Sequence, residues 1–354
     1  MQTTHYASVL AKIGAQRSNL LSEAKLKVLS DSPTLPDFTA QLQETPYHKQ
    51  ISKIQLPLSG RKLEHAFNEN LIETCQKIIK YAPQSVSDYL QTYLLHFEIE
   101  NIKILLKGTL AGYSAEQKTS KTYPSSASRY VEWHNVFENA AKASNLTQLI
   151  NTFKKTPYLS TLNRGLNNYN KSGSAACFDM FLDVFFYDHL YDSYEKLPET
   201  EKPHANLYAS LKNDSYTLLS ILRGKNLNYD SNELRLTMPH KYFHLPTKEV
   251  EALILAPNFD STLKIALNGY YANYFSKDAS PDETLAKAER RFQHAVVKHA
   301  QNSPRFFFNI GLPLAYITLK ETETSNLRML SLGIDASVPS EAIQKQLFYA
   351  NFYR

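Results

Sequence analysis

The sequence predicts an all-α protein built from three helical repeat units, and three observations indicate this fold class. Only ten of the 354 residues are glycine. Apolar residues recur at helical spacing, as Tyr6, Val9, Leu10 and Ile13 do near the N-terminus. A short pattern of an acid, an Asn or Thr, an aliphatic residue and a glycine occurs three times without insertion or deletion. The copies lie 116 and 109 residues apart, so we expect three units of one fold.

This repeated pattern, called the motif below, defines three sets of equivalent residues. The sets are Glu98, Asn101 and Gly108 in the first copy, Asp214, Thr217 and Gly224 in the second, and Glu323, Asn326 and Gly333 in the third. They predict units at residues 1–124, 125–238 and 239–354. The acid and amide could form a carboxylate–amide pair in a functional site. Because the same residue types recur in a chain with no other catalytic grouping, we favour the alternative that these partly buried groups tie neighbouring helices together.

A second pattern marks the start of each unit. Leu35, Phe38 and Leu42 precede Thr45-Pro46-Tyr47 at the spacing that Leu146, Leu149 and Phe153 keep before Thr156-Pro157-Tyr158. A Thr before a Pro is typical of a helix start. In the third unit only Leu253 and Pro257 align with this pattern. Ser280-Pro281 predicts a later helix start in this unit, with Glu283 completing a capping box.

A long helix carrying the motif is expected at the end of each unit, for example over about 84–107. Glu98, Asn101 and Gly108 then share one face of that helix. Lys107 and Arg223 suit the last turn, and Gly108 and Gly224 are expected to end their helices in the left-handed conformation. Residues 114–129 are unusually polar and predict a loop.

The densest group of metal-ligating residue types consists of Asp179, Asp183, Asp188, His189 and Asp192. On one helix these acids form two i, i+4 pairs that could collect a divalent cation. The alternative is a polar face opposite a set of phenylalanines, which we favour because the two pairs point in different directions. His240 and His244 have the spacing of a helical zinc pair but lie between prolines without a third ligand, so a linker or a short helix is expected.

The sequence shows no motif that would support another kind of catalysis or ligand binding. Phosphate-binding loops, dinucleotide fingerprints and hydrolase motifs are missing, so we predict no catalytic, cofactor-binding or metal-binding residues. The formal charge of +5 is dispersed without a basic stretch interleaved with aromatics, which argues against nucleic acid. Cys75 and Cys177 lack a metal-type spacing and predict reduced, buried thiols. No stretch approaches the ~20 apolar residues of a membrane span, so we expect a cytoplasmic protein.

Three runs of residues, Phe97–Lys103, Leu222–Lys225 and above all Tyr316–Arg328, resemble the central-stalk subunit of rotary ATPases. That subunit is called C in archaeal-type and d in vacuolar-type enzymes. The resemblance covers nearly the whole chain, although Thr217 replaces the usual Asn of the family. It implies a non-catalytic rotor subunit of an A/V-type ATPase or ATP synthase, with three pseudo-symmetric units arranged as a funnel.

The resemblance also implies the partners. The subunit would couple the rotating shaft to the membrane rotor ring for proton or sodium transport, without a small-molecule substrate, nucleic acid or transmembrane segment of its own. It would be cytoplasmic and peripheral to the membrane through the complex. Basic residues near the ends of the motif helices are candidate contacts for acidic shaft or ring loops: Lys107, Arg223, Lys225 and Arg328.

Two alternatives remain open at this point. One is an all-α metal-dependent enzyme of the terpenoid-synthase type that uses the acids between Asp179 and Asp192. The other is a helical-repeat binding scaffold unrelated to ATPases.

Overall fold

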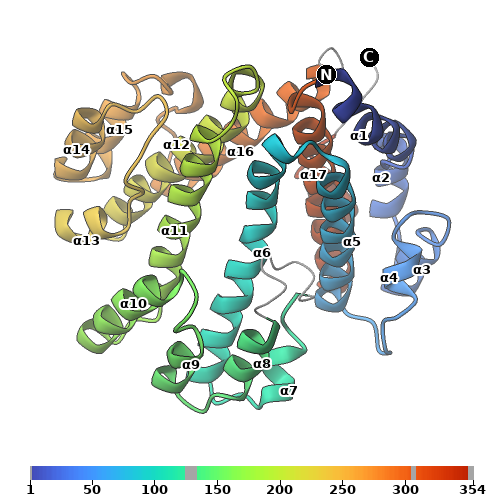
Figure 1. The fold of residues 1–354 in the computed structure, drawn as a ribbon, viewed down its shortest axis with the longest axis horizontal. Helices are drawn as coiled ribbons and strands as arrows, with labels where there is room; N and C mark the ends of the chain where they lie inside the picture. The colour runs from blue at the N-terminus through green and yellow to red at the C-terminus, as the bar shows by residue number, and fades with distance from the viewer. Residues whose placement is uncertain (1, 124–133, 304–307, 350–354) are drawn as a thin grey trace. The chain divides into compact units, whose positions relative to one another are not determined.

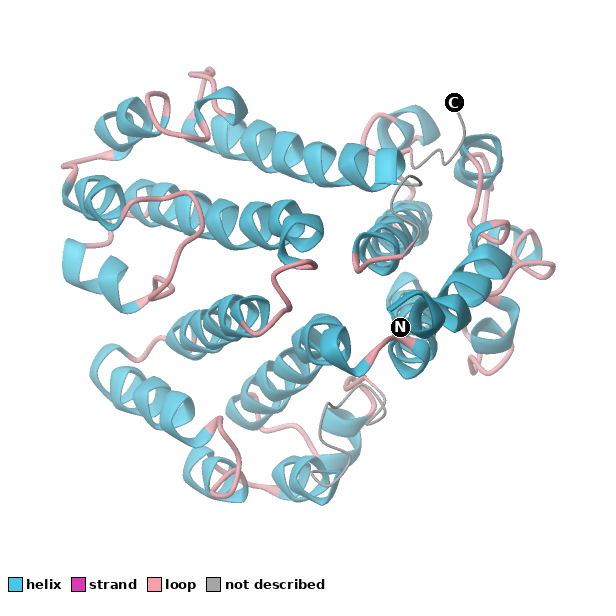
Figure 2. Cartoon of the chain, turned by 45° about the horizontal axis from the view of Figure 1, so that its top comes forward, coloured by secondary structure: helices cyan, strands magenta, loops and turns pink. Residues whose placement is uncertain are grey.

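The computed structural model describes residues 2–123, 134–303 and 308–349, and every regular element among them is a helix (Figure 2). The prediction of an all-α fold is therefore confirmed. The described residues pack as two compact units. The first contains the described parts of Met1–Leu94, Tyr123–Ala127 and Val297–Arg354, and the second those of Leu95–Thr122 and Ser128–Val296.

The first unit is built around two long helices, α5 (Gly60–Tyr81) and α17 (Gly311–Asp335), which pack along each other (Figure 1). Gly60 permits the close approach, because a Cβ there would lie 3.1 Å from the Leu332 backbone. Its N–H also donates to Asp335 Oδ2 at 2.8 Å. The other helices of this unit are α1 (Gln2–Arg17), α2 (Glu23–Ser30), α3 (Leu35–Ala40), α4 (His48–Ile51), α18 (Ser340–Gln344), the start of α6 (Gln84–Leu110) and the end of α16 (Pro281–Asn302).

One hydrophobic core joins the beginning of the chain to its end within the first unit. Phe38 and Tyr47 from the N-terminal part lie in the same buried cluster as Leu327, Leu330 and Ile343. The repeated apolar residues before Tyr47 therefore face a motif helix that lies almost 300 residues later in the chain.

The second unit contains the rest of α6 and α16 and the helices between them. These are α7 (Ala115–Thr119), α8 (His134–Lys142), α9 (Leu146–Thr152), α10 (Leu159–Ser172), α11 (Ala176–Glu195), α12 (Lys202–Asn226), α13 (Ser231–Leu236), α14 (Thr247–Leu255), α15 (Phe259–Ala266) and the 3₁₀ helix η3 (Ala272–Tyr274). Its core packs the motif residues Leu218 and Ile221 of α12 against α14, α15 and α16.

The same helix start occurs three times. Thr34, Asn145 and Asn258 each accept a side-chain hydrogen bond from the backbone N–H three residues later, at 3.3, 2.9 and 3.0 Å. These residues cap α3, α9 and α15, and a tyrosine follows each cap after 13 residues: Tyr47, Tyr158 and Tyr271. This satisfies an N–H that would otherwise lack a partner.

The caps correct the expected position of the third anchor. Pro257 directly precedes the cap Asn258, whereas Pro46 and Pro157 follow their caps by 12 residues. The alignment through Leu253 and Pro257 is therefore wrong, and Tyr271 is the third anchor residue. The helices expected at Thr45 and Thr156 begin two residues after the proline, while each Thr hydroxyl accepts the N–H of the tyrosine.

The motif helices also end differently from the expectation. The N–H groups of Tyr113, Tyr229 and Val338 donate to the carbonyls of Gly108, Gly224 and Gly333, each at 2.8 Å. Left-handed residues stand four positions after each glycine, at Gly112 (φ 71°), Asn228 (φ 60°) and Ser337 (φ 57°). The prediction of left-handed Gly108 and Gly224 is wrong, because a Schellman-type end forms one turn later.

The motif glycines instead leave room for a side chain of the short helix that follows each motif helix. The side chains of Lys118, Leu234 and Ile343, each ten residues after its glycine, lie where a Cβ would be 2.7, 2.3 and 2.6 Å away. A hydrogen in place of a side chain permits this approach. The loop predicted at 114–129 is wrong over its first part, because α7 forms there with a Ser114 and Gln117 capping box, and 124–129 lie outside the described residues.

Candidate functional site

The three motif acids are buried, and each accepts a hydrogen bond from a buried anchor tyrosine. Glu98, Asp214 and Glu323 are 1, 0 and 4% exposed. The tyrosine–carboxylate pairs are Tyr158–Glu98 at 2.8 Å, Tyr271–Asp214 at 2.8 Å and Tyr47–Glu323 at 2.7 Å, measured from the hydroxyl to a carboxylate oxygen. The same chemistry therefore fixes three different helices to three different anchors.

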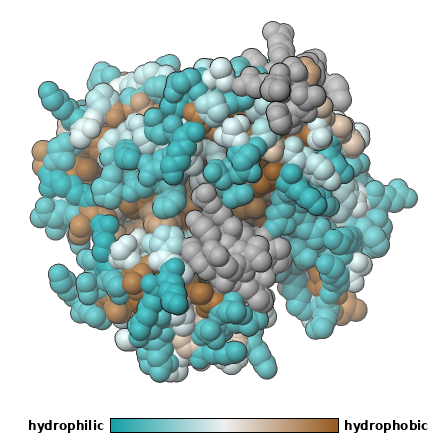
Figure 3. Space-filling view, in the orientation of Figure 1, coloured by the Kyte–Doolittle hydropathy of each residue, from teal (hydrophilic) through white to brown (hydrophobic). Residues whose placement is uncertain are grey.

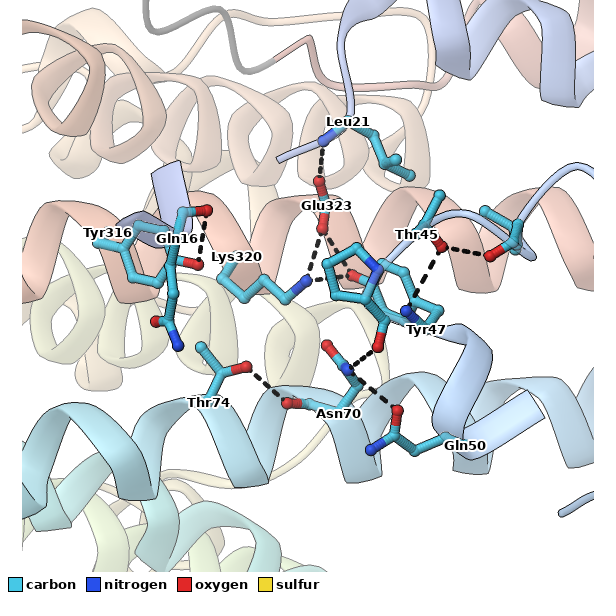
Figure 4. Close-up of polar contacts among 12 residues, drawn as sticks. Gln16, Leu21, Thr45, Tyr47, Gln50, Asn70, Thr74, Tyr316, Lys320 and Glu323 are labelled. Carbon is cyan, nitrogen blue, oxygen red and sulfur yellow. Dashed lines mark hydrogen bonds and ion pairs between the residues drawn. The ribbon is translucent and has the colours of Figure 1, made fainter. Parts of the chain in front are cut away.

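The Tyr47–Glu323 pair includes a buried cation (Figure 4). Lys320 Nζ donates to Glu323 Oε1 at 2.7 Å and to the Tyr47 hydroxyl at 2.9 Å. It also lies 4.1 Å from the centre of the Tyr47 ring. The Leu21 N–H donates to the other carboxylate oxygen. Two side chains and one backbone group thus surround a carboxylate that has lost contact with water.

The Tyr271–Asp214 pair relies on backbone donors instead. The N–H groups of Phe243 and His244 donate to the two Asp214 oxygens at 3.0 and 2.8 Å. Both groups belong to the linker before α14. Asp214 therefore holds an irregular segment and an anchor tyrosine against the same helix.

Burial decides the protonation of these groups. It raises the pKa of Tyr47 well above its usual value, and the Glu323 charge raises it further. Burial and then the Asp214 charge raise the pKa of Tyr271 in the same way. Both hydroxyls consequently remain protonated donors. Burial also raises the pKa of Asp214, although three hydrogen-bond donors act against this.

The remaining polar motif residues are buried too. Asn326 donates to the Phe348 carbonyl and accepts the Phe348 N–H at 2.9 Å, which holds the last described segment against α17. Thr217 donates to the carbonyl of Asn213 at 3.2 Å. Asn101 lies buried on α6. Of these two sets of bonds, those of Asn326 join separate segments, whereas the Thr217 bond stays within α12.

The four cations suggested as partner contacts have different surroundings. Lys107 pairs with Asp179 at 2.8 Å, Arg223 with Glu289 at 2.6 Å, and Arg328 with Glu64 at 2.6 Å. All three keep exposed side chains beside these carboxylates. Lys225 is only 9% exposed, and burial lowers its pKa. Its side chain offers little surface to a partner, unlike the other three.

The acids of α11 are engaged by neighbouring donors. Asp183 accepts from Lys103 at 2.6 Å, and Asp192 pairs with Lys241 at 2.6 Å. Asp188 accepts from the His240 N–H at 2.8 Å and contacts the His240 ring nitrogen at 2.6 Å. Burial alone would lower the pKa of Lys103, but the carboxylates of Asp183 and Glu100 outweigh it and raise that pKa.

Within the described ranges, no group of three or more His, Cys, Asp or Glu residues is arranged to hold a metal ion. His240 and His244 lie in an irregular segment, so the linker forms and the short helix does not. Cys75 and Cys177 are free thiols, and Cys75 is buried as predicted whereas Cys177 is only half-buried. Hydrophilic residues cover most of the face in Figure 3. Among the residues that the structure describes, no helix is both long and apolar enough to cross a bilayer.

The sequence indicated the acids and two of the tyrosines but did not pair them. It missed Tyr271 because the Thr and Pro of the anchor are absent there, and it missed Lys320 because this residue occurs in one copy only. A useful signal was present: a tyrosine follows each capping residue after 13 positions.

Comparisons with known proteins agree with the resemblance seen in the sequence. The family model of the ATP synthase (C/AC39) subunit matches residues 9–346. The chain is similar to the C subunit of the A-type ATP synthase of Thermococcus kodakarensis, with 24% identity over 348 residues that cover 97% of this chain and 90% of that protein.

Two further relatives carry the same name. That of Methanocaldococcus jannaschii is 23% identical over 351 residues, covering 97% of this chain and 86% of its own. That of Methanosarcina acetivorans is 24% identical over 348 residues, covering 98% and 93%. With a family model that spans almost its whole length, the chain belongs to the ATP synthase (C/AC39) subunit family.

Proposed function

We propose that this chain is a non-catalytic rotor subunit of an A/V-type ATPase or ATP synthase. In this role it couples the rotating shaft to the membrane rotor ring, and torque passes through it without any bond being made. The observation that carries the proposal is the set of three buried tyrosine–carboxylate pairs in a chain of this family. A part that transmits torque has to resist deformation, and buried polar ties to fixed helices provide such resistance.

We further propose three repeat units at 1–124, 125–238 and 239–354, arranged as a funnel. The recurring cap, tyrosine, acid and glycine support this division. The pairing is cyclic: Tyr158 of the second repeat binds Glu98 of the first, Tyr271 of the third binds Asp214 of the second, and Tyr47 of the first binds Glu323 of the third. A cyclic set of joints suits a closed arrangement around a shaft.

The partners in this proposal are the shaft subunits and the rotor ring, and the chain stays cytoplasmic and peripheral to the membrane through them. Lys107, Arg223 and Arg328 are the proposed contacts for acidic loops, since their exposed side chains can exchange an internal carboxylate for one on a partner. Lys225 is proposed as a weaker contact because it is nearly buried. The metal-dependent enzyme is disfavoured because lysines and His240 occupy the α11 acids.

Binding to purified partners tests this proposal. The full chain should co-purify with the isolated rotor ring and with the isolated shaft, and should bridge the two when all three are mixed. The isolated catalytic head without its shaft serves as the control and should not retain the chain. Retention by the head alone, or failure to bind both ring and shaft, would contradict the proposed coupling role.

A further inference from the structure

One stretch of the chain carries cations without any acid. Between Asn139 and Phe178, forty residues include Lys142, Lys154, Lys155, Arg164 and Lys171 but no Asp or Glu. These five positive charges equal the formal net charge of the whole chain, +5. The rest of the chain is therefore neutral on balance, so the excess charge, which we expected to be dispersed, is concentrated in this one segment.

All five cations lie at the surface of one structural region. They stand at the ends of α8 and α9 and along α10, which neighbour one another in the second unit (Figure 1). Each of the five side chains is exposed. Between them lie exposed neutral polar residues: Ser144, Asn145, Asn151, Ser160, Asn163, Asn167 and Asn170. We call residues 139–178 the basic surface.

Acids flank this surface at both ends in the sequence, and Glu138 lies one helical turn before Lys142 on α8. Asp179, which follows it directly, pairs with Lys107 of α6 at 2.8 Å, and Asp183 pairs with Lys103 at 2.6 Å. None of the five cations pairs with a carboxylate among the described residues. Arg164 instead lies over the ring of Phe181, at 4.7 Å from its centre. Lysines of α6 thus pair with two aspartates of α11, and its other two aspartates pair with His240 and Lys241, so none of the four pairs with the cations of α10.

The kind of partner follows from what the basic surface lacks. Protein interfaces are usually centred on apolar and aromatic side chains. The structure describes all of residues 139–178, and no large hydrophobic side chain there is exposed. Dispersed cations separated by neutral hydrogen-bonding groups match a diffuse anionic partner, such as a layer of lipid headgroups.

We propose that the basic surface docks this chain electrostatically on anionic phospholipid headgroups. Lys142, Lys154, Lys155, Arg164 and Lys171 contact phosphate groups, and the asparagine amides donate to phosphate and ester oxygens. No apolar residue inserts between the lipids, so the contact is reversible and depends on salt. The proposal does not depend on the rotor function, because it concerns the chain alone.

Vesicle co-sedimentation of the full chain tests the proposal. Binding is expected to vesicles of phosphatidylcholine mixed with phosphatidylglycerol and not to phosphatidylcholine alone, and it should fall steeply as salt rises. A lysine near an anionic surface contributes about fivefold in binding. The variant Lys142→Gln/Lys154→Gln/Lys155→Gln/Lys171→Gln should therefore bind about 100-fold more weakly or worse.

A matched variant controls for net charge. Lys80→Gln/Lys248→Gln/Lys264→Gln/Lys298→Gln removes four exposed lysines outside the basic surface and should keep binding within about tenfold, since charge far from the lipid is screened. Replacing the four basic-surface lysines with arginine should preserve binding. Equal losses in the two glutamine variants would overturn the proposal. Binding to polyglutamate but not to anionic vesicles would also overturn it, in favour of an acidic protein partner.

Discussion

The Glu323 and Asp214 sites use the same tyrosine–carboxylate pair but compensate the buried charge differently. Glu323 has a lysine within 2.7 Å, whereas Asp214 has two backbone N–H groups at 2.8 and 3.0 Å. The position of Lys320, three residues before the acid, is occupied by Leu211 in the Asp214 site. A shared motif therefore fixes where the acid lies, and the local surroundings decide how its charge is stabilised.

The difference also concerns what each site holds together. Glu323 joins the last motif helix to an anchor at the beginning of the chain, through Tyr47 and Leu21. Asp214 joins its helix to the segment that follows it, through Tyr271 and the linker at residues 243–244. Loss of the Glu323 contacts would release segments that lie far from this helix in the sequence. Loss of the Asp214 contacts would release only the segment that follows its helix.

The largest effect is expected from Lys320→Leu, which gives the Glu323 site the residue found at position 211. The carboxylate would remain 4% exposed without a cation, with only Tyr47 and the Leu21 N–H as donors. Breaking a buried ion pair on one side costs about 3–5 kcal/mol. Urea unfolding should show this loss, and the variant Lys320→Leu/Glu323→Leu should recover most of it. An unchanged midpoint for Lys320→Leu would mean that Tyr47 and the Leu21 N–H stabilise the Glu323 carboxylate without a cation.

A smaller effect is expected when the tyrosine hydroxyls are removed. Tyr271→Phe should cost about 1.5–3 kcal/mol, the range for a hydrogen bond to a charged group. Tyr47→Phe should cost less, because Lys320 still compensates Glu323. Unfolding of both variants checks this order. Tyr81→Phe, at an exposed tyrosine, is the control and should stay within about 0.5 kcal/mol. The reverse order would show that Lys320 acts mainly through Tyr47.

The motif glycines offer a third comparison. A Cβ on Gly224 would lie 2.3 Å from Leu234 Cδ2, and Leu234 is buried. We expect Gly224→Ala to cost about 1–2 kcal/mol, since overpacking outweighs the gain in helix propensity. Gly14→Ala is the matched control in α1, where nothing lies within 4 Å, and it should be neutral or slightly stabilising. Thermal melts of the two variants distinguish a packing role from a purely conformational one.

The smallest expected effect is a difference in pH dependence. Burial raises the pKa of Asp214 above its ordinary value of 3.8, so the folded state keeps this proton after the unfolded state has released it. Its contribution to the unfolding free energy therefore falls as pH rises from about 3.8 through the folded-state pKa. Relative to Asp214→Asn, the unmodified chain should lose stability over that range. A difference in unfolding free energy between the two proteins that stays constant as pH changes would contradict the raised pKa of Asp214.

The sequence predicted some levels of this structure and not others. Helical spacing and the motif gave the all-α fold and the three buried acids, because both depend on periodicity along the chain. The partners of the acids come from residues up to 302 positions away, as for Leu21 and Glu323, and local patterns do not determine such contacts. The helix ends were misplaced because a glycine can serve close packing as well as a left-handed turn, and sequence alone does not separate these uses.

The pairing of Lys107 with Asp179 and of Lys103 with Asp183 shows why the sequence alone did not decide whether the acids of α11 bind a metal. Five acid and histidine residues on one helix suggested a possible cation site, yet lysines on α6 supply the positive charge. The amino-acid sequence contains these lysines but does not show that they lie beside the acids of α11 in the folded chain. The salt bridges of the folded chain also reveal that none of the four aspartates of α11 pairs with a cation of the basic surface.

Reconstitution of the complete ATPase with and without this chain tests the proposed coupling role most directly. ATP hydrolysis by the head and ion transport across the vesicle membrane are measured on the same preparation. The account predicts that omission leaves hydrolysis in place and stops ion transport, and that adding the chain back restores transport. Coupled ion transport that persists in a complex without the chain would contradict it.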